Sequence, residues 1–362
     1  MIQAQTADSL IIEGKIPGLP AGLQVTLLSQ EFHHRSEIAK TVSTDGAFRL
    51  TGKVASPTLC LLDIKNENDP KSIGKEIELM VENGAIAISA AHTDSLPPSF
   101  TFTTEKLLNA CHVNIAGGRV QEEYAEYQKF MLPYLLAAKQ AHYNLYIAPE
   151  ADKRNETDSK PFEKKYKAAE YSADSAQMAF VRLNPDYAIS SYLLCTRLER
   201  PFVFTDEEID SFLQLTKNNH DPARLKQLHK LAATGRRFVK GTHYTDFPAL
   251  DTEKNEHRLS EYLTNGHLLL VDFWASLCGP CRMAIPHVRE LNRTYAGSLD
   301  VCSVSLDQKE EEWYKAMDAE KMEWTQLWLP KHLQQTPTHA YSIQGIPYLL
   351  LLSPEGEILY GG

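Results

Sequence analysis

The sequence has few cysteines, no long apolar run and no excess of basic residues, and each absence excludes a class of protein. Six cysteines in 362 residues are too sparse for a scaffold held together by disulfides. No run of about 18 apolar residues occurs, so we expect no membrane span. The net charge of -10 argues against nucleic acid as a partner, because nucleic acids favour basic surfaces.

The start of the chain, MIQAQTADSL, lacks the basic residues and the apolar stretch of a signal peptide. We therefore expect either a cytoplasmic protein or a chain from which a targeting segment was removed. At 362 residues the chain is too long for one ordinary core. Since a domain holds roughly 100–200 residues, two or three domains are expected.

Three regions differ in the spacing of their apolar residues. Residues 1–105 hold short apolar runs such as LQVTLLS and TLCLLDI between turn signals, which predicts a β-sandwich. Residues 106–237 repeat apolar residues at helical spacing and predict a helical region. Residues 238–362 alternate buried strands with helices, which predicts an α/β fold whose sheet is covered on both faces.

Two dipeptides in the first region, Asp45-Gly46 and Asn83-Gly84, are typical of β-hairpin turns. They predict that the strands on either side of each dipeptide pair with one another.

Isolated cysteines and histidines in the first two regions carry little chemical signal. Cys60, Cys111 and Cys195 stand alone, and we expect them to be small buried residues. His33 and His34 are adjacent, so in a strand their side chains face opposite ways and form at best a weak metal site.

The segment LLLVDFWASLCGPCRMAIP, residues 268–286, contains Cys278 and Cys281 two residues apart. A structural zinc site needs four ligands, usually from two such pairs, whereas His287 is the nearest further candidate and Cys302 lies within an apolar strand. A zinc site is therefore disfavoured. A purely structural disulfide is also disfavoured, because closing a loop of about four residues adds little stability.

A redox pair explains more of this segment. Cys278 ends a strand-to-helix turn, and the unpaired N–H groups and dipole of a helix N-terminus favour an anion. The thiolate is the form that attacks a disulfide. Cys281 lies one helical turn further on, on the same side, where it can resolve a mixed disulfide. Pro280 suits the first turn because it has no N–H that would be left unpaired there.

The segment VDFWASLCGPCRMAIP resembles the active-site region of thioredoxin, and GIP near the end of the chain resembles the cis-proline loop of that family. The preceding LDTEKNEHRLSEYL and the later SPEGEI hairpin resemble the TlpA/ResA-type thiol-disulfide oxidoreductases of the bacterial envelope. This resemblance covers residues 238–362. The upstream regions resemble, more loosely, the N-terminal extension with a DUF4369-type β domain that such proteins carry in Bacteroidetes.

The resemblance assigns the chemistry to three residues. Cys278 is implied to be the attacking thiol and Cys281 the resolving thiol, and the two are implied to form a redox-active disulfide. Asp272 matches the buried carboxylate of thioredoxin, which is implied to exchange a proton with Cys281. Burial within LLLVDFWA should raise the pKa of Asp272, which agrees with this role.

The resemblance also implies a surface on which a partner binds. Pro347 matches the cis-proline that faces the cysteines, so that the backbone of Ile346 can pair with an extended substrate. Leu277 stands where thioredoxin has a tryptophan, which makes the lip of the site smaller and more aliphatic. The full set of expected substrate-binding residues is Trp274, Leu277, Gly279, Pro280, Ile346 and Pro347.

The function implied by the resemblance is a thiol-disulfide oxidoreductase of the cell envelope, in the periplasm. It needs no bound cofactor or metal, and it exchanges electrons with disulfide-containing or dithiol partner proteins and with an unidentified electron donor. Gly-Pro between the cysteines is similar to the reducing members, which favours reduction of partners. One alternative is a redox-responsive binding module without turnover. A second is a thiol peroxidase, although no threonine or serine precedes Cys278 in the peroxidase arrangement.

One departure concerns the end of the fold. A thioredoxin fold finishes with one more helix that covers the sheet, whereas this chain stops at Gly362, soon after the SPEGEI hairpin. We therefore expect the final helix to be absent, either because it was removed or because another surface replaces it.

Overall fold

The computed structural model divides the chain into two compact units. The first comprises Met1–Leu194 and Leu215–Lys226, and the second comprises Cys195–Gln214 and Gln227–Gly362. The residues described are 8–31, 34–69, 74–99, 112–147, 160–199, 204–263, 266–343 and 345–362. The predictions for His33 and Cys111 lie outside these residues.

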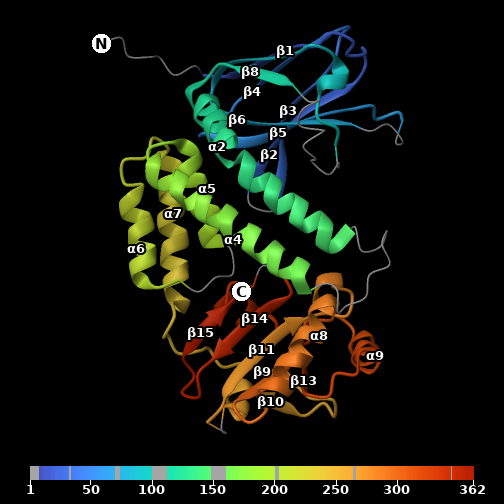
Figure 1. Cartoon of the computed structure of the whole chain (residues 1–362), viewed down its shortest axis with the longest axis vertical. Coiled ribbons are helices and arrows are strands. Elements are labelled where there is room, and N and C mark those ends of the chain that lie inside the picture. Colours follow the sequence, from blue (N-terminus) through green and yellow to red (C-terminus); the bar gives the residue numbers. More distant parts are fainter. Residues whose placement is uncertain are drawn as a thin grey trace. The chain divides into compact units, whose positions relative to one another are not determined.

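The first unit begins with two four-stranded sheets, which confirms the predicted β-sandwich (Figure 1). One sheet has the order β4-β1-β7-β8, built from Ala47–Gly52, Leu10–Lys15, Gly84–Ala90 and Val113–Ala116. The other has the order β3-β2-β5-β6, built from His34–Val42, Gln24–Glu31, Thr58–Lys65 and Lys75–Val81. Apolar side chains of both sheets, such as Ile12, Leu27 and Leu62, form one buried core. A short 3₁₀ turn, Thr93–Ser95, follows β7.

The two turn dipeptides do not pair their flanking strands, and that part of the sequence prediction is wrong, although Thr44 and Ala47 around Asp45-Gly46 form an isolated antiparallel bridge. Asp45-Gly46 joins β3 to β4, and Asn83-Gly84 joins β6 to β7, but in both cases the two strands belong to different sheets. Gly46 and Gly84 have φ values of 73° and 147°, a region open to glycine. The dipeptides thus mark sharp reversals, while the pairing partner of each strand is set by distant residues.

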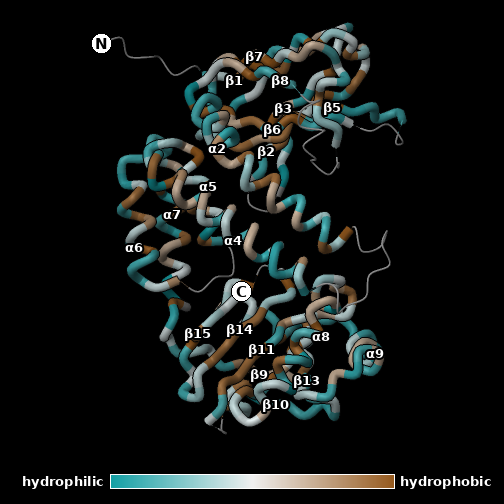
Figure 2. Tube along the Cα trace, in the orientation of Figure 1, coloured by the Kyte–Doolittle hydropathy of each residue, from teal (hydrophilic) through white to brown (hydrophobic). Residues whose placement is uncertain are grey.

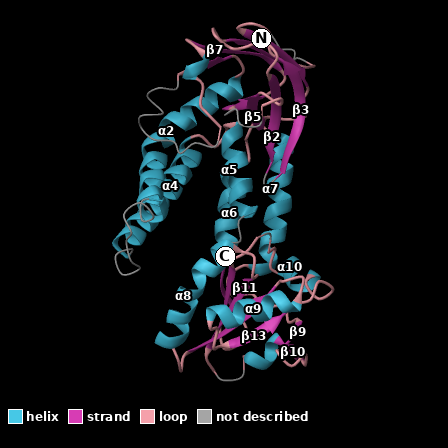
Figure 3. Cartoon of the chain, turned by 90° about the vertical axis from the view of Figure 1, so that its right-hand side faces the viewer, coloured by secondary structure: helices cyan, strands magenta, loops and turns pink. Residues whose placement is uncertain are grey.

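Helices follow the sandwich, as the helical spacing predicted. α2 spans Arg119–His142 and α4 spans Lys160–Leu183, and the two lie side by side in Figures 1 and 3. α2 runs on through Pro133 and ends in a π-helical turn, Tyr143–Ile147. The remaining helices are α5 (Ala188–Glu199), α6 (Asp206–Leu215) and α7 (Pro222–Gly235), with a 3₁₀ turn over Arg236–Phe238.

The second unit contains a seven-stranded sheet in the order β10-β9-β13-β12-β11-β14-β15. Its strands are Glu256–Arg258, Pro248–Leu250, Thr325–Trp328, Leu299–Ser305, Leu268–Trp274, Tyr348–Leu352 and Ile358–Gly361. The central strands β11, β12 and β13 are parallel to one another. The predicted C-terminal hairpin is β14–β15, which is antiparallel. The helices between its strands are α8 (Gly279–Thr294), α9 (Glu310–Glu320) and α10 (Gln335–Ala340), with a 3₁₀ turn over Leu259–Tyr262.

The central strand β11 carries apolar side chains on both faces, so the sheet has a core on each side. Because side chains alternate along a strand, Leu269, Val271 and Phe273 enter one core. Leu270 and Trp274 enter the other, together with α8 and α9 residues. Figure 2 shows the resulting hydrophobic colouring of β11. Asp272 lies between Leu270 and Trp274 and therefore faces the α8 side of the sheet.

Candidate active site

Cys278 and Cys281 lie where β11 passes into α8, and a disulfide joins them with a Cα–Cα distance of 5.2 Å. Cys278 is the N-cap of α8, and its Sγ atom accepts a hydrogen bond of 3.1 Å from the backbone N–H of Cys281. Pro280 occupies the first turn, as the sequence predicted. The helix N-terminus therefore directs a backbone N–H group at the sulfur of Cys278. This arrangement favours the thiolate once the disulfide is reduced.

The two cysteines differ in exposure. Cys281 is 2% exposed and packs in the α8-side core with Trp274 and Ile285. Cys278 is only partly buried, and its neighbours Gly279 and Pro280 are exposed. A partner that approaches from solvent can therefore reach the sulfur of Cys278 but not that of Cys281.

The loop before β14 brings a backbone carbonyl to the same sulfur. The Ile346–Pro347 peptide bond is cis, as expected from the resemblance. The carbonyl oxygen of Ile346 lies 3.6 Å from Cys278 Sγ. The sulfur carries no proton in the disulfide, whereas a reduced Cys278 thiol has a proton that it can donate to this oxygen. Ile346 is half-buried and Pro347 is exposed, so the loop borders the reactive sulfur at the surface.

Asp272 is a buried carboxyl group on the same face of the sheet as Cys281. Its side chain is 3% exposed, and its Oδ2 accepts a 2.9 Å hydrogen bond from the hydroxyl of Ser303 on β12. Burial raises the pKa of Asp272 to about 6, and the Ser303 hydrogen bond opposes the rise. The raised pKa agrees with the sequence prediction, and it lets this group take up and release a proton near neutral pH.

A second buried carboxylate holds the turn in front of Cys278. The carboxylate of Asp307 accepts hydrogen bonds from the backbone N–H of Ser276 at 3.0 and 3.1 Å, and from its hydroxyl at 2.6 Å. The hydroxyl of Ser305 donates to the other carboxylate oxygen at 2.8 Å. Asp307 is 4% exposed. Because Ser276 stands two residues before Cys278, these bonds fix the turn that presents the exposed sulfur.

The predicted partner-binding residues separate into exposed and buried ones. Leu277, next to Cys278 in the chain, is 84% exposed, and Met283 on α8, which was not predicted to bind a partner, is 66% exposed. Trp274, also predicted to bind a partner, is instead fully buried. Its position on β11 turns the indole into the α8-side core that also holds Cys281, so it presents no surface to a partner.

Sequence reasoning missed Ser276, Ser303, Asp307 and Trp324. Trp324 Nε1 donates a 2.8 Å hydrogen bond to the Ser303 hydroxyl oxygen, which links it to Asp272. Ser276 lies within the active-site segment but was not singled out, and the other three belong to no local motif. The parallel pairing of β11 with β12, which places Asp272 opposite Ser303, is the signal that would have found this group.

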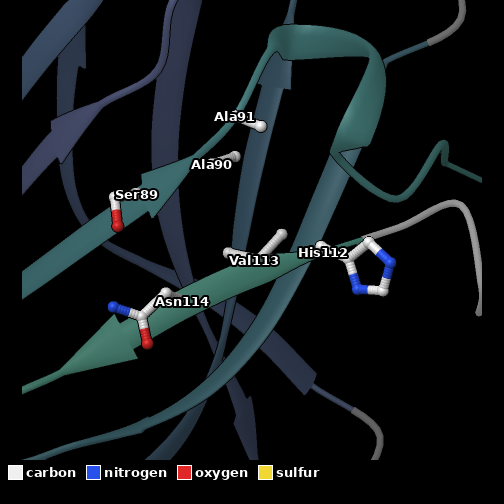
Figure 4. Close-up of a pocket in the computed structure, with 6 residues that line it drawn as sticks. All are labelled: Ser89, Ala90, Ala91, His112, Val113 and Asn114. Atoms are coloured by element: carbon white, nitrogen blue, oxygen red, sulfur yellow. The ribbon is translucent and has the colours of Figure 1, made fainter.

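Hollows also lie outside this site, and one of them is lined by Glu78, Tyr124 and Lys139 among other residues. A hollow of about 380 Å³ lies against the paired strands β7 and β8, and of the described residues that line it, His112 alone is titratable (Figure 4). In the residues that the structure describes, no group of three or more histidine, cysteine, aspartate or glutamate side chains could hold a metal. Within the same residues, no helix combines the length and the apolar character needed to cross a bilayer.

Two family models match the chain. The model described as thioredoxin-like matches residues 266–358, and a domain of unknown function, DUF4369, matches residues 10–124. The chain thus contains a thioredoxin-like domain, and it carries a DUF4369 domain before it. Both matches confirm the resemblances seen in the sequence.

Individual relatives align with the thioredoxin-like part. The thioredoxin of Pseudomonas aeruginosa is 44% identical over 83 residues, which is 23% of this chain and 54% of that protein. The chain thus spans about half the length of this curated relative. The thioredoxin domain of a thiol-disulfide oxidoreductase from Bacteroides vulgatus is 29% identical, with 34% of this chain and 88% of that one covered and a TM-score of 0.33. A putative thiol:disulfide interchange protein DsbE from Chlorobium tepidum is 27% identical, with 34% and 84% covered and a TM-score of 0.31.

Proposed function

We propose that the protein is a thiol-disulfide oxidoreductase that reduces disulfides of partner proteins in the cell envelope. The observation that carries this proposal is the Cys278–Cys281 disulfide at the N-terminus of α8, with one sulfur accessible and the other buried. The thioredoxin-like family match and the names of the similar structures support it.

In the first step, the thiolate of reduced Cys278 attacks one sulfur of a partner disulfide. A bond forms between Cys278 Sγ and that sulfur, the partner disulfide breaks, and the other partner sulfur leaves as a thiolate that takes up a proton. Leu277 and Met283 offer exposed apolar contacts to the partner. The backbone of Ile346 borders the reacting sulfur, where it can pair with an extended partner segment.

In the second step, the Cys281 thiol gives its proton to ionised Asp272 and attacks Cys278 Sγ as a thiolate. The Cys278–Cys281 disulfide forms, and the partner sulfur leaves with the electron pair and takes up a proton. Two electrons have then passed from the chain to the partner. An electron donor, a dithiol of unidentified nature, returns the chain to the reduced form.

Insulin reduction with dithiothreitol as electron donor tests the proposal. The chain should accelerate reduction, and Cys278→Ser should abolish the acceleration. Cys281→Ser should accumulate a mixed disulfide through Cys278, and mass spectrometry of that species from the native host would identify the partner. A wild-type rate no higher than that of Cys278→Ser would instead favour a redox-responsive binding module. Peroxide consumption faster than disulfide reduction would favour a thiol peroxidase.

A further inference from the structure

A row of polar side chains crosses the centre of the sheet on the α8 side. Asp272 on β11 is in register with Ser303 on β12, and Ser303 is in register with Gln326 on β13. Trp324, the residue just before β13, lies in the same α8-side core. The residues around this row are apolar core residues such as Leu270 and Val301.

Two hydrogen bonds connect three members of this group in a fixed direction. The indole N–H of Trp324 donates to Ser303 Oγ at 2.8 Å, and the hydroxyl of Ser303 donates to Asp272 Oδ2 at 2.9 Å. An indole can only donate, so Ser303 must accept from Trp324. A hydroxyl has one proton, and the accepted bond leaves that proton to point at the carboxylate. Ser303 is fully buried and Trp324 is 8% exposed, so water does not readily replace either bond.

We propose that Ser303 and Trp324 are positioning residues that hold Asp272 in its ionised form and so set the pH range in which Cys281 resolves the mixed disulfide. This proposal rests on the proposed function for its link to turnover. Trp324 acts through Ser303, because its bond fixes the hydroxyl rotor and polarises the O–H group that Asp272 accepts. The hydrogen bonds of the two residues run to each other and to Asp272, and those of the described chain join neither residue to a reacting sulfur.

The surroundings of Asp272 leave this pair as its main polar support. Burial raises the pKa of Asp272, and the hydrogen bond from Ser303 lowers it. On the α8 side, α8 presents Cys281, and α9 presents Trp313 and Ala316. β14 places Leu349 opposite Asp272.

Cys302 on β12 is next to Ser303 in sequence but enters the core on the other face of the sheet. Burial and then the charge of Asp272 raise the pKa of the Cys302 thiol, so it stays protonated at neutral pH. It therefore places no second charge near Asp272 in the working pH range.

The direct test is the pKa of Asp272, measured by carboxyl-carbon NMR on the full reduced chain. Ser303→Ala should raise that pKa by about one pH unit, since it removes a hydrogen bond to a charged group. Trp324→Phe should raise it by a smaller amount, and it should add nothing in the Ser303→Ala background. Trp313→Phe is the matched control, because Trp313 is fully buried in the same core and its indole nitrogen has no partner among the described residues. It should leave the pKa unchanged.

The kinetic test follows resolution of a preformed mixed disulfide as a function of pH. The acid limb should follow the pKa of Asp272, so both variants should move it upward by the shift seen in NMR. In an Asp272→Asn background this acid limb should be absent, and neither variant should change the pH dependence of the resolution rate. An unchanged Asp272 pKa in folded Ser303→Ala and Trp324→Phe proteins would overturn the proposal, as would a shifted pKa with an unmoved limb. A chain that shows the pKa shifts but reduces no disulfide would instead overturn the proposed function.

Discussion

At the scale of single residues, the site depends on a charge that the fold disfavours. Asp272 is 3% exposed, and burial raises its pKa to about 6. An acid with a folded-state pKa above its unfolded value of 3.8 stabilises the fold most when it is protonated. Stability is therefore lost as pH rises through the folded pKa. At neutral pH the ionised Asp272 lowers the free energy of unfolding, but it is the form that can accept a proton from Cys281.

Asp272→Asn should raise the free energy of unfolding at pH 8 by up to about 3 kcal/mol, because asparagine cannot ionise. The gain should shrink as pH falls from about 6 and vanish below pH 3.8, where the wild-type group becomes protonated in both states. Urea unfolding of the oxidised wild-type and Asp272→Asn proteins at a series of pH values measures this difference in the free energy of unfolding. A stability difference that is constant with pH would contradict the raised pKa.

Leu277→Ser should weaken recognition of protein partners while it leaves the chemistry intact. Leu277 is 84% exposed, so its removal should change stability little, but a partner that covers it loses about 1.4 kcal/mol of apolar contact. We expect kcat/KM for insulin to fall about tenfold. The rate with a small disulfide such as hydroxyethyl disulfide should not change. Val42→Ser, at a 54% exposed position on β3, serves as the control. Equal losses for both substrates would show that Leu277 acts on the chemistry.

At the scale of elements, the start of α8 is fixed by residues outside it. The turn after β11 is held by Asp307, which follows β12 and accepts hydrogen bonds from Ser276 and Ser305. The exposed sulfur thus depends on the alignment of two parallel strands. Strand β12 contributes both Ser303, which supports Asp272, and Ser305, which supports Asp307.

Asp307→Asn should lower the rate of the first step and the free energy of unfolding together. An amide nitrogen cannot accept from Ser276 or Ser305, so one buried donor loses its partner at a cost of about 1–3 kcal/mol. Stopped-flow oxidation of the reduced chain and urea unfolding measure the two effects. Asp251→Asn is the matched control, since Asp251 also accepts backbone N–H groups, but in the turn between β9 and β10. An Asp307→Asn rate equal to that of the control would refute this role.

The sequence predicted the elements of the C-terminal domain because their signals are local. The continuous apolar run of β11, the helix-starting Pro280 and the turn glycine Gly356 each act on neighbouring residues. The same locality explains the failures. Asp45-Gly46 shows a sharp reversal but not which sheet receives each strand.

The cysteine pair could be read from spacing, whereas its supporting network could not. Ser303 and Asp307 lie roughly 30 residues after the residues they bind, and only strand register brings them together. For Trp274, in contrast, a local motif led to a wrong prediction. Its place in the motif suggested contact with a partner, but the alternation of side chains on β11 turns it inward.

At the scale of the whole molecule, the chain places separate cores in its two units. The sandwich core is formed by residues between Leu10 and Ile115, and the two cores of the thioredoxin-like part are formed by residues between Tyr244 and Ile358. Because the sandwich core shares no residue with the other two cores, damage to it should leave the redox site intact.

Leu62→Ala should destabilise the sandwich by about 2–5 kcal/mol, since Leu62 is fully buried in its core and alanine leaves a cavity. Calorimetry should show a lower transition temperature for the sandwich. The rate of insulin reduction per folded molecule should stay at the wild-type value below that transition. If the rate of insulin reduction instead fell at the temperature at which the sandwich unfolds, the activity of the redox site would depend on the folded sandwich.

The unequal exposure of the two cysteines determines the identity of the covalent intermediate. Two thiols can in principle form two isomeric mixed disulfides with one partner sulfur. Burial of Cys281 removes one of these isomers, so every encounter should yield the same linkage, through Cys278. A complex captured with Cys281→Ser should therefore carry the same linkage that the wild-type chain forms, so structural work on the trapped partner would describe the natural intermediate.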